Sequence, residues 1–484
     1  MSWRFFALLL VFTSVPGMAK KKPLAAPVDT QIVEESTDSV DDIPELNIGT
    51  SESVRLSLQD SVGMAIQAAT SVLKAKNNLD VTGAALLQSY GQFLPNLVAS
   101  ANNTWNQGNI YYAQSVPTLV NTVNAGAGYS LNADLNLFNG LSDYAHLRAS
   151  ILRKDASDLT LYRAKQAIAL DVTQSFLTVI LDERLLEFAR KNLQQSVARE
   201  KLLLEQTRVG AKSLADLFRQ QAQKSADQSL LLNAENRKRS DQILLLQKLR
   251  ADVARNYQFV DDNLIASGPD SRFDDEQSLL HLGLNNRADL KATNKTSDAF
   301  HYDVDSQWGN YLPKLDLQGG VLSSGSYLYQ QSTSAGNLVP PNQNPLYNQL
   351  ANQVDYTVGI VLSWTIFDRF LTRQQVAQAR ADARNAEIDA QDLHNQVQAD
   401  VRLAFSSYKT AIQQLKASKK GLESAQKAYE VIEGRYEVGS ANFIDLVTAQ
   451  SALLQAESAR AQALIDFVLQ GKTVEFSTGE TKVD

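Results

Sequence analysis

Apolar and polar residues alternate along two short segments of the chain, residues 127–138 and 354–367. In the first segment, which reads YSLNADLNL from Tyr129 to Leu137, every second residue is apolar and the others are Ser, Asn and Asp. A period of two with one apolar face is typical of a half-buried β-strand. About ten residues also suffice for a tilted strand to cross a bilayer. The pattern therefore predicts two strands, each with an apolar and a polar face.

Each of these strands is expected to pair with a weaker strand, at residues 94–106 and 313–329. The weaker segments are rich in Gly and Asn and alternate less regularly. The connections at 107–128 and 330–353 are polar and rich in Asn, Pro and Gly, so we expect long loops there. An antiparallel sheet in a soluble sandwich would show the same alternation, and this alternative stays open at this point.

A very long helix is predicted after each strong strand, at residues 139–207 and 368–435. The first of these helices has no proline, and its apolar residues recur at near-heptad spacing, which is typical of a coiled coil. At about 1.5 Å per residue it is about 100 Å long, far more than a bilayer requires. Asn139 and Asp368 are good N-cap residues, so we expect each helix to begin there, directly after its strand.

The chain contains a long internal repeat. YGQFLPNL at 90–97 corresponds to WGNYLPKL at 308–315, and TRVGAKSLADLFRQQ at 207–221 corresponds to YEVGSANFIDLVTAQ at 436–450. The order helix, strand, strand, long helix and returning helix is therefore expected twice. We predict a first repeat at 52–260 with a returning helix at 212–257, a linker at 261–275, a second repeat at 276–471 with a returning helix at 440–470, and a tail at 472–484.

Four strands in one chain cannot close a barrel, because single-chain barrels have at least about eight. In lipid, an open sheet edge would leave backbone groups without hydrogen bonds, at a cost of several kcal/mol each. If the strands lie in a membrane, several copies of the chain must therefore combine. Two copies would give a barrel filled by side chains, whereas three would give a barrel with a lumen.

Composition narrows the function classes. The formal net charge is -7, which provides no basic surface for nucleic acid. Because the chain has no cysteine, it can have no disulfide, no thiolate metal site and no lipid-modified N-terminal cysteine. After the N-terminus, no segment has the run of about 18 apolar residues that a membrane-spanning helix requires.

The N-terminal segment is typical of exported proteins. Residues 1–19, MSWRFFALLLVFTSVPGMA, contain Arg4, an apolar run and small residues near Ala19, which predicts a secretory signal peptide rather than an apolar helix of the fold. KKK at 20–22 leaves the cleavage position open. Residues 20–51 include the acidic run VDTQIVEESTDSVDDIPEL, which we expect to be a disordered linker, with partner binding as the alternative.

Catalytic and metal-binding constellations are not expected. The four histidines lie in different segments, and in HYDVD the side chains of His301, Asp303 and Asp305 do not share a helix face. AGAGYS at 125–130 leads into a strand rather than a helix, so it is not a phosphate-binding loop. After removal of the signal peptide Met64 is the only methionine, which gives no support to a thioether copper relay. We predict no enzyme activity, no cofactor and no resident metal.

With these motifs in place, the sequence resembles the TolC-type outer-membrane efflux protein family over roughly residues 52–471. The resemblance rests on the paired motifs above, on NRADL at 286–290 and on LFNG at the first strand-to-helix junction. It implies a mixed α and β membrane protein, mostly helical: a homotrimer with a twelve-strand barrel in the outer membrane of a Gram-negative bacterium and a tunnel of helices across the periplasm. The second junction, FDRFL, lacks the family's usual glycines.

The resemblance also implies a function and partners. A channel of this family passively conducts substrates to the exterior from an inner-membrane RND or ABC pump and a periplasmic adaptor protein, in tripartite efflux or type I secretion. Two other functions stay open on the sequence alone. One is a structural coiled-coil tether without a bore, and the other is a secreted enzyme with an unrecognised site.

The first candidate residues lie on the strands. The alternation predicts that Leu135, Leu362 and Trp364 face lipid, whereas Asp134 and Asp355 line water.

The turns after the long helices supply the second group. Their glycines are expected to be left-handed caps. By resemblance, the turns form the periplasmic entrance and the adaptor-docking surface, with residues Val209, Gly210, Ala211, Val438, Gly439 and Ser440.

The third group concerns a gate. By resemblance, Asp445 matches an acid that faces the channel axis at its narrowest point, and Asp216 is placed to hydrogen-bond Tyr436. Three Asp445 carboxylates around the axis would attract multivalent cations. The spacing alone allows a simpler interpretation, in which both acids cap the returning helices together with Ser213 and Asn442 as N-cap residues.

This chain departs from the family's gate pattern at two positions. It has Ala441 where the family often has arginine, and Thr448 where it often has a second acid. The gate is therefore expected to be weaker or to be held shut by other residues.

Overall fold

The computed structural model describes residues 54–112, 118–260, 271–333 and 344–483. One compact unit, Glu52–Asp484, contains all of them. The predicted signal peptide at 1–19 and acidic linker at 20–51 lie outside the described residues, as does most of the predicted linker at 261–275.

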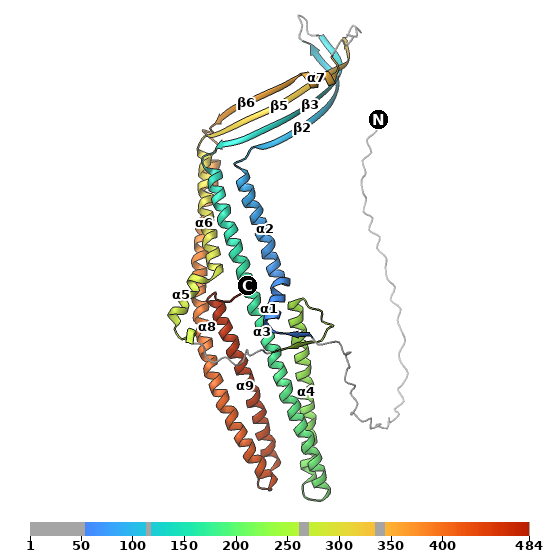
Figure 1. Cartoon of the computed structure of the whole chain (residues 1–484), viewed down its shortest axis with the longest axis vertical. Coiled ribbons are helices and arrows are strands. Elements are labelled where there is room, and N and C mark those ends of the chain that lie inside the picture. The colour runs from blue at the N-terminus through green and yellow to red at the C-terminus, as the bar shows by residue number, and fades with distance from the viewer. Residues whose placement is uncertain (1–53, 113–117, 261–270, 334–343, 484) are drawn as a thin grey trace, which may run out of the picture. The chain divides into compact units, whose positions relative to one another are not determined.

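The long helices and the four long strands follow the same order in the two halves of the described chain (Figure 1). The first half contains β1 (Val54–Leu56), α1 (Leu58–Ala68), α2 (Thr70–Gly91), β2 (Asn96–Tyr112), β3 (Thr118–Phe138), α3 (Ser142–Arg208), α4 (Leu214–Leu249) and β4 (Tyr257–Phe259). The second half contains η1 (Ser271–Phe273), α5 (Glu276–Asn286), α6 (Ala288–Trp308), η2 (Gly309–Tyr311), β5 (Lys314–Thr333), α7 (Leu346–Asn352), β6 (Val354–Ser363), α8 (Leu371–Glu437) and α9 (Phe443–Ser477). In both halves a shorter helix leads into two strands, a long helix and a returning helix.

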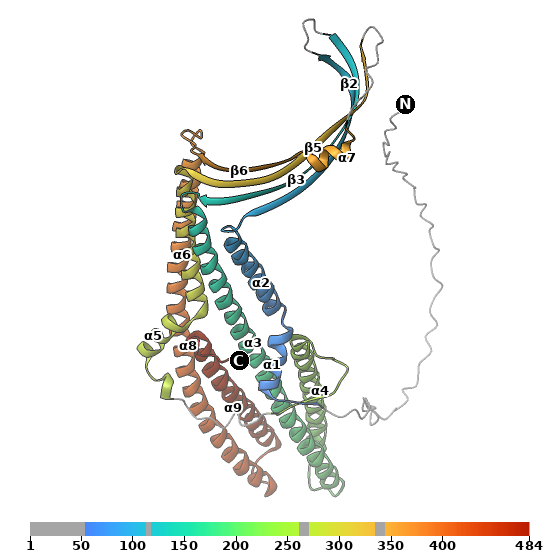
Figure 2. The same ribbon diagram turned by 45° about the horizontal axis from the view of Figure 1, so that its top comes forward.

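The four long strands form one sheet in the order β2, β3, β5, β6, antiparallel throughout. The central pair joins the two halves of the chain, because β3 lies beside β5, with Leu135 opposite Leu317. β2 and β6 are the outer strands of this sheet. Figure 2 shows the four strands curving together above the helices. A small second sheet pairs β1 with β4 in parallel.

The strands are longer than the alternation predicted. β2 continues to Tyr112 and β3 already begins at Thr118, so most of the expected loop at 107–128 is paired strand. Pairing supplies hydrogen bonds to backbone that is rich in Gly and Asn, which side-chain alternation cannot reveal. In the second half, helix α7 lies within the expected loop at 330–353, and β6 ends at Ser363 rather than at residue 367.

The strand-to-helix junctions differ from the expected N-caps. The helices begin at Ser142 and Leu371, three residues after Asn139 and Asp368, because two consecutive residues at each junction have positive φ. The side chains of Asn139 and Asp368 nevertheless accept hydrogen bonds from backbone amides at the start of each helix. Oδ1 of Asn139 accepts a hydrogen bond from the Asp143 amide at 3.3 Å, and Oδ2 of Asp368 accepts one from the Thr372 amide at 2.6 Å.

Helix α3 is the central helix of the structure. It packs against α2, α4, α6 and α9, whereas α8 packs against α5, α6 and α9. Phe176 and Val179 of α3 are fully buried in an apolar cluster with Leu245 of α4 and Ile465 of α9. None of the described helices is long and apolar enough to cross a membrane.

The C-terminal part of the chain is more ordered than a tail. Helix α9 continues to Ser477, beyond its expected end at residue 470, and the segment that follows is folded back onto the helices. Thr478 is fully buried and Val483 is 5% exposed. Hydrogen bonds from α3 to backbone carbonyls hold this segment in place. The prediction of a tail at 472–484 was therefore wrong for residues 472–477, which continue α9.

Candidate functional site

Two helical turns lie at the same end of the molecule, one between α3 and α4 and one between α8 and α9 (Figure 1). Gly210 and Gly439 occupy the same position in each turn, with φ of 75° and 77°. A Cβ on either glycine would meet no atom within 4 Å, so only the left-handed backbone requires glycine there. Val209 and Val438, directly before them, are 71% and 79% exposed. Both turns thus present an apolar tip to solvent.

The two returning helices are capped differently. Asn442 accepts a hydrogen bond from the Asp445 amide at 2.9 Å, and Asp445 accepts one from the Asn442 amide at 3.4 Å. This is a complete capping box. In the first hairpin Ser213 accepts from the Ala215 amide at 3.1 Å, while the Asp216 carboxylate pairs with Arg219 at 3.4 Å.

The predicted hydrogen bond between Asp216 and Tyr436 is absent from the structure. The Tyr436 hydroxyl is buried and has no hydrogen-bond partner among the described residues. Its ring packs against Phe443, at 6.3 Å between centroids, and Nζ of Lys212 lies 4.2 Å from its centroid. Burial, and then the nearby Asp216 carboxylate, raise the pKa of Tyr436. The two side chains are therefore neighbours, but Asp216 is engaged by Arg219.

A different residue, Arg199 of α3, joins the two helical hairpins. Its guanidinium donates to Oε1 of Gln450 on α9 and, at 3.1 Å, to the hydroxyl of Tyr429 on α8. That hydroxyl in turn donates to Glu433 at 2.5 Å. Gln450 also donates to Asn192 of α3 at 2.7 Å. Because the Arg199 side chain is only 12% exposed, these bonds are shielded from solvent.

The sequence analysis did not identify Arg199. Its position three residues after the buried Ser196, on a seam that is otherwise apolar or small, is the one signal that could have drawn attention to it. A charged residue at such a seam requires a buried partner.

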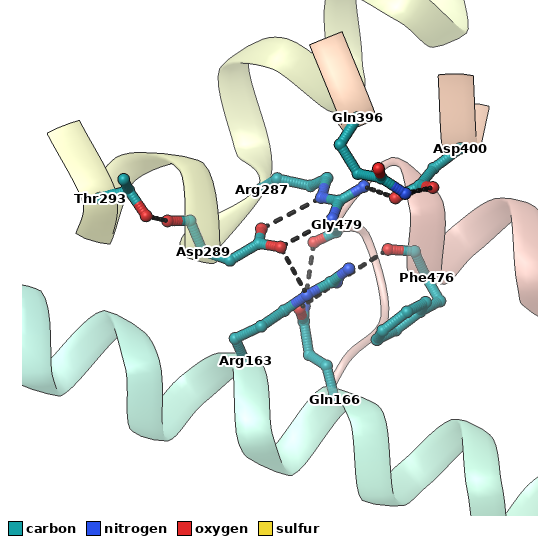
Figure 3. Close-up of polar contacts among 9 residues, drawn as sticks. All are labelled: Arg163, Gln166, Arg287, Asp289, Thr293, Gln396, Asp400, Phe476 and Gly479. Carbon is teal, nitrogen blue, oxygen red and sulfur yellow. Dashed lines mark hydrogen bonds and ion pairs between the residues drawn. The ribbon is translucent and has the colours of Figure 1, made fainter. Parts of the chain in front are cut away.

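A second polar cluster holds the middle of the helices together (Figure 3). Arg287 lies between α5 and α6 and is 5% exposed at its side chain. It donates at 2.7 Å both to Asp289 and to Asp400 of α8. The NRADL motif at residues 286–290 thus supplies one guanidinium and one carboxylate of this cluster.

The same cluster holds the C-terminal segment (Figure 3). Arg163 of α3 donates to the Phe476 carbonyl at 2.9 Å, and its guanidinium lies 3.7 Å from the centroid of the Phe476 ring. Gln166, fully buried, donates to the carbonyls of Gly479 and Thr481 at 3.1 and 3.0 Å. Burial lowers the pKa of Arg163 to about 10, against the attraction of Asp289, so the guanidinium remains charged at neutral pH.

The sheet register shows which of the alternating side chains share a face. Leu135 lies opposite Leu317, which lies opposite Ile360, so these side chains share one face. Asp134, one residue away, belongs to the other face. Leu362 is 70% exposed and follows Ile360 by two residues on the same face. Asp355 is exposed on the opposite face.

Aromatic side chains lie near both ends of the sheet. At one end Tyr329 lies 4.8 Å from Trp105 and 4.9 Å from Tyr327 between ring centroids. At the other end Trp364 is 62% exposed, and its indole N–H donates to the Tyr311 carbonyl at 3.1 Å. Aromatic residues at two levels of an apolar face are typical of strands that cross a bilayer.

Metal-binding clusters of three or more His, Cys, Asp or Glu residues do not occur in the described part of the chain. His301, in the HYDVD segment, pairs with Glu387 of α8 at 2.9 Å, where both side chains are about half exposed.

Comparison with known proteins finds a family that part of the chain resembles. Residues 279–479 match the family described as outer membrane efflux protein. Through this region, the chain is similar to that family. The NRADL motif, the β5 and β6 strands and the second helical hairpin all lie within the matched residues. Among curated protein sequences, no relative matches the chain.

Solved structures share the fold over nearly the whole described chain. The outer membrane protein VceC of Vibrio cholerae is 16% identical, with 87% of this chain and 96% of that chain covered and a TM-score of 0.71. The outer membrane channel CmeC of Campylobacter jejuni is 17% identical, with 87% and 85% covered and a TM-score of 0.70. The MtrE outer membrane channel of Neisseria gonorrhoeae, in its open state, is 15% identical, with 87% and 88% covered and a TM-score of 0.63.

The description of the matched family agrees with the outer-membrane location expected from the sequence.

Proposed function

We propose that this chain is the outer-membrane channel of a tripartite efflux or type I secretion system. Three copies form a closed barrel that continues into a tunnel of helices, and substrates pass through it passively from an inner-membrane RND or ABC pump and a periplasmic adaptor. The observation that carries the proposal is the sheet order, in which β2 and β6 are left as edges.

The internal repeat indicates how these edges are covered. The two halves correspond with Tyr90 matching Trp308 and Phe138 matching Phe367. In this correspondence Asn96 opposite Asp134 is equivalent to Lys314 opposite Ser363, and both pairs occur in the sheet. Pairing within each half is thus the same.

The pairing of β3 with β5 joins the two halves. The equivalent pairing of β6 with β2 does not occur within one copy of the chain. Asp134 lies opposite Gln318 where β3 meets β5. The equivalent pair is Ser363 of β6 opposite Ser100 of β2, and it can form only between two copies of the chain. Repeating this contact around an axis closes the sheet, which in lipid removes the cost of unpaired edges. Three copies of the four-stranded sheet make a twelve-strand barrel with a lumen.

The packing at the strand-to-helix junction also indicates contact with a second copy of the chain. Gly140 lies against Gly309, so that the end of α6 packs on the start of α3. The equivalent positions are Arg369 and Gly91, and a Cβ on Gly91 would meet nothing within 4 Å. On α2, Val81 and Leu87 are 65% and 73% exposed. We infer that this surface of α2 packs on α8 of a second copy.

The turns at the far end of the helices are proposed as the entrance and as the adaptor-docking surface. Their exposed Val209 and Val438 offer the apolar contacts that a partner protein can bury. Asp445 is proposed to line the constriction as a ring of three carboxylates. Closure is proposed to depend on Arg199, which ties α3 to both helices of the second hairpin.

Cysteine cross-linking tests the assembly, because the chain has no cysteine of its own. In a Ser100→Cys, Ser363→Cys double variant, oxidation is expected to give linked dimers and trimers and no larger species, since directly opposite residues have the spacing that a disulfide requires. Asp134→Cys, Gln318→Cys is the matched control, because that pair should link only within one copy. Linked species that continue beyond trimers, or none at all, would rule out the trimeric barrel.

Conductance separates a channel from a tether. The purified trimer in a planar bilayer is expected to conduct ions once its entrance is opened by variants such as Arg199→Ala. A folded, fully cross-linkable trimer that never conducts would instead identify a coiled-coil tether.

A further inference from the structure

Asp227 of α4 is a buried acid, and its hydrogen-bond donors among the described residues are all uncharged. The residue is 4% exposed. Its Oδ1 accepts from Nδ2 of Asn192 on α3 at 2.8 Å and from Nε2 of Gln223 at 3.0 Å, and its Oδ2 accepts from the Ser196 hydroxyl. A buried carboxylate depends on such donors, because the loss of any one of them leaves charge without a partner.

The hydrogen bonds continue from Asp227 to Arg199. Oδ1 of Asn192 accepts from Nε2 of Gln450 on α9 at 2.7 Å, and Oε1 of Gln450 accepts from the Arg199 guanidinium. Asn192 is 6% exposed and Gln450 is 7% exposed, so both amides are shielded from water. Asp227, Asn192, Gln450 and Arg199 thus form a buried polar chain that passes from α4 through α3 to α9.

The two ends of the polar chain fix the direction of each bond. An ionised carboxylate can only accept, and a guanidinium can only donate. Asn192 must therefore turn its NH₂ toward Asp227, which leaves its oxygen for Gln450. Gln450 donates to that oxygen and keeps its own oxygen for Arg199. Neighbouring bonds in such a chain also polarise one another in the same sense. The orientation of the Gln450 amide is therefore set from both sides.

We propose that Asp227 is a positioning residue, which orients the Gln450 amide for Arg199 through Asn192. A residue of α4 thereby strengthens the contact between the first hairpin and α9. The bond from Arg199 to Tyr429 does not belong to the polar chain, so loss of Asp227 weakens only the part of the contact that Gln450 makes. The effect on the channel entrance rests on the proposed function, whereas the positioning itself concerns only the contact between the hairpins.

The second half of the chain shows that a helical hairpin forms without such polar residues. The positions equivalent to Asp227, Asn192 and Arg199 are Ala456, Gly421 and Ala428. Helices α8 and α9 nevertheless pack along each other. Buried polar groups are costly to desolvate, and the comparison argues against hairpin formation as their only role in the first half.

Hydrogen exchange tests the positioning without reference to transport. In the assembled protein, Asp227→Ala is expected to make the α9 amides around Gln450 exchange roughly three- to tenfold faster, as the loss of one ordering hydrogen bond predicts. In an Arg199→Ala background the same change should add less than about twofold, because the bond that Asp227 positions is already absent. A role confined to packing of α3 on α4 would give the same increase in both backgrounds.

Asp227→Asn keeps the volume of the side chain and serves if the alanine variant does not fold. Its amide can turn either its oxygen or its NH₂ toward Asn192, so the direction of the polar chain is no longer fixed. Exchange around Gln450 should rise by a smaller factor, again only when Arg199 is present. Glu200→Gln is the matched control, because it breaks the pair with Lys224 between the same two helices, at 3.1 Å. It should leave exchange around Gln450 unchanged.

Two results would overturn the proposal. One is exchange around Gln450 at the wild-type rate in both Asp227 variants, and the other is an increase of equal size with and without Arg199. Resting conductance is a separate measurement, expected to rise in Asp227→Ala but not beyond its level in Arg199→Ala. If exchange changes as expected while conductance stays at rest, the positioning stands, and the proposed role of Arg199 in closure fails.

Discussion

Gly140 and Gly309 meet without room for a side chain. A Cβ on Gly140 would stand 2.2 Å from the Gly309 carbonyl oxygen, and its φ of +71° already disfavours other residues. This contact brings the end of α6 against the start of α3, at the point where a strand becomes a helix. Gly91, the residue equivalent to Gly309, has open space around it within one copy.

Alanine at these glycines should therefore have different effects. Gly140→Ala is expected to destabilise the protein by roughly 3 kcal/mol, because it adds a backbone clash to a left-handed conformation. Gly91→Ala should leave each copy folded but weaken trimer formation, if α8 of a second copy packs there. Chemical denaturation and native electrophoresis measure the two effects. Normal trimers from Gly91→Ala would place the intermolecular contact elsewhere.

The sheet faces can be tested by charge. Leu362→Arg should destabilise the assembled protein by roughly 2 to 4 kcal/mol if the residue lies near the bilayer midplane, whereas Asp355→Arg on the opposite face should be tolerated. Assembly in detergent and in lipid vesicles measures the difference. Equal assembly of the two variants would show that the lipid-facing side has been assigned incorrectly.

The docking role of the turns predicts a loss of function without a loss of assembly. Trp in place of Ala211 or Ser440 is expected to abolish export in cells, because a bulky side chain at the exposed turn blocks the contact with the adaptor. Trimer yield should remain normal, since nothing lies within 4 Å of a Cβ at the adjacent glycines. If such variants export at the wild-type rate, the adaptor contacts another surface.

Arg199 and Tyr436 should behave in opposite ways. Arg199→Ala removes the bonds that join α3 to Gln450 and Tyr429, so resting conductance should rise. Tyr436→Phe removes a buried hydroxyl that has no hydrogen-bond partner in the described part of the chain. It should leave conductance unchanged, while stability stays equal or rises by about 1 kcal/mol. A rise in conductance in Tyr436→Phe would instead support the gating hydrogen bond between Asp216 and Tyr436 that the family resemblance implied.

Asp445 serves as a cap in this structure, and its second role can be separated from the first. Asp445→Asn is expected to relieve block by trivalent cations added from the periplasmic side. Loss of the capping box should also cost about 1 kcal/mol. A variant that loses only this stability, with the cation block unchanged, would confine Asp445 to capping.

Much of the architecture follows from local sequence patterns. The long helices, the returning helices and the strong strand at residues 354–367 depend on periodicity and on turn glycines, which act over a few residues. The extra length of β2 and β3 could not be predicted in this way, because Gly126 and Gly128 are held by pairing with distant residues on both sides.

Fewer contacts of the candidate site than of the fold could be predicted, because many of them join residues that are far apart in sequence. The capping role of Asp445 depends on residues three apart and was recognisable from spacing. The bonds of Arg199 join α3 to residues 251 and 230 positions away on α9 and α8, which no local pattern can indicate. The missing bond of Tyr436 shows the limit of analogy, since Arg219 engages Asp216 instead.

The sheet order has a consequence for the origin of such a chain. If β6 pairs with β2 of the next copy as β3 pairs with β5, the assembled wall consists of six nearly equivalent half-chains. The geometry of this wall then does not depend on whether the two halves belong to one chain. A protein half as long, present in six copies, could build the same wall. Joining two such halves in one gene leaves each free to diverge. The buried Asp182 shows such divergence, because the equivalent position in the second half is Ala411.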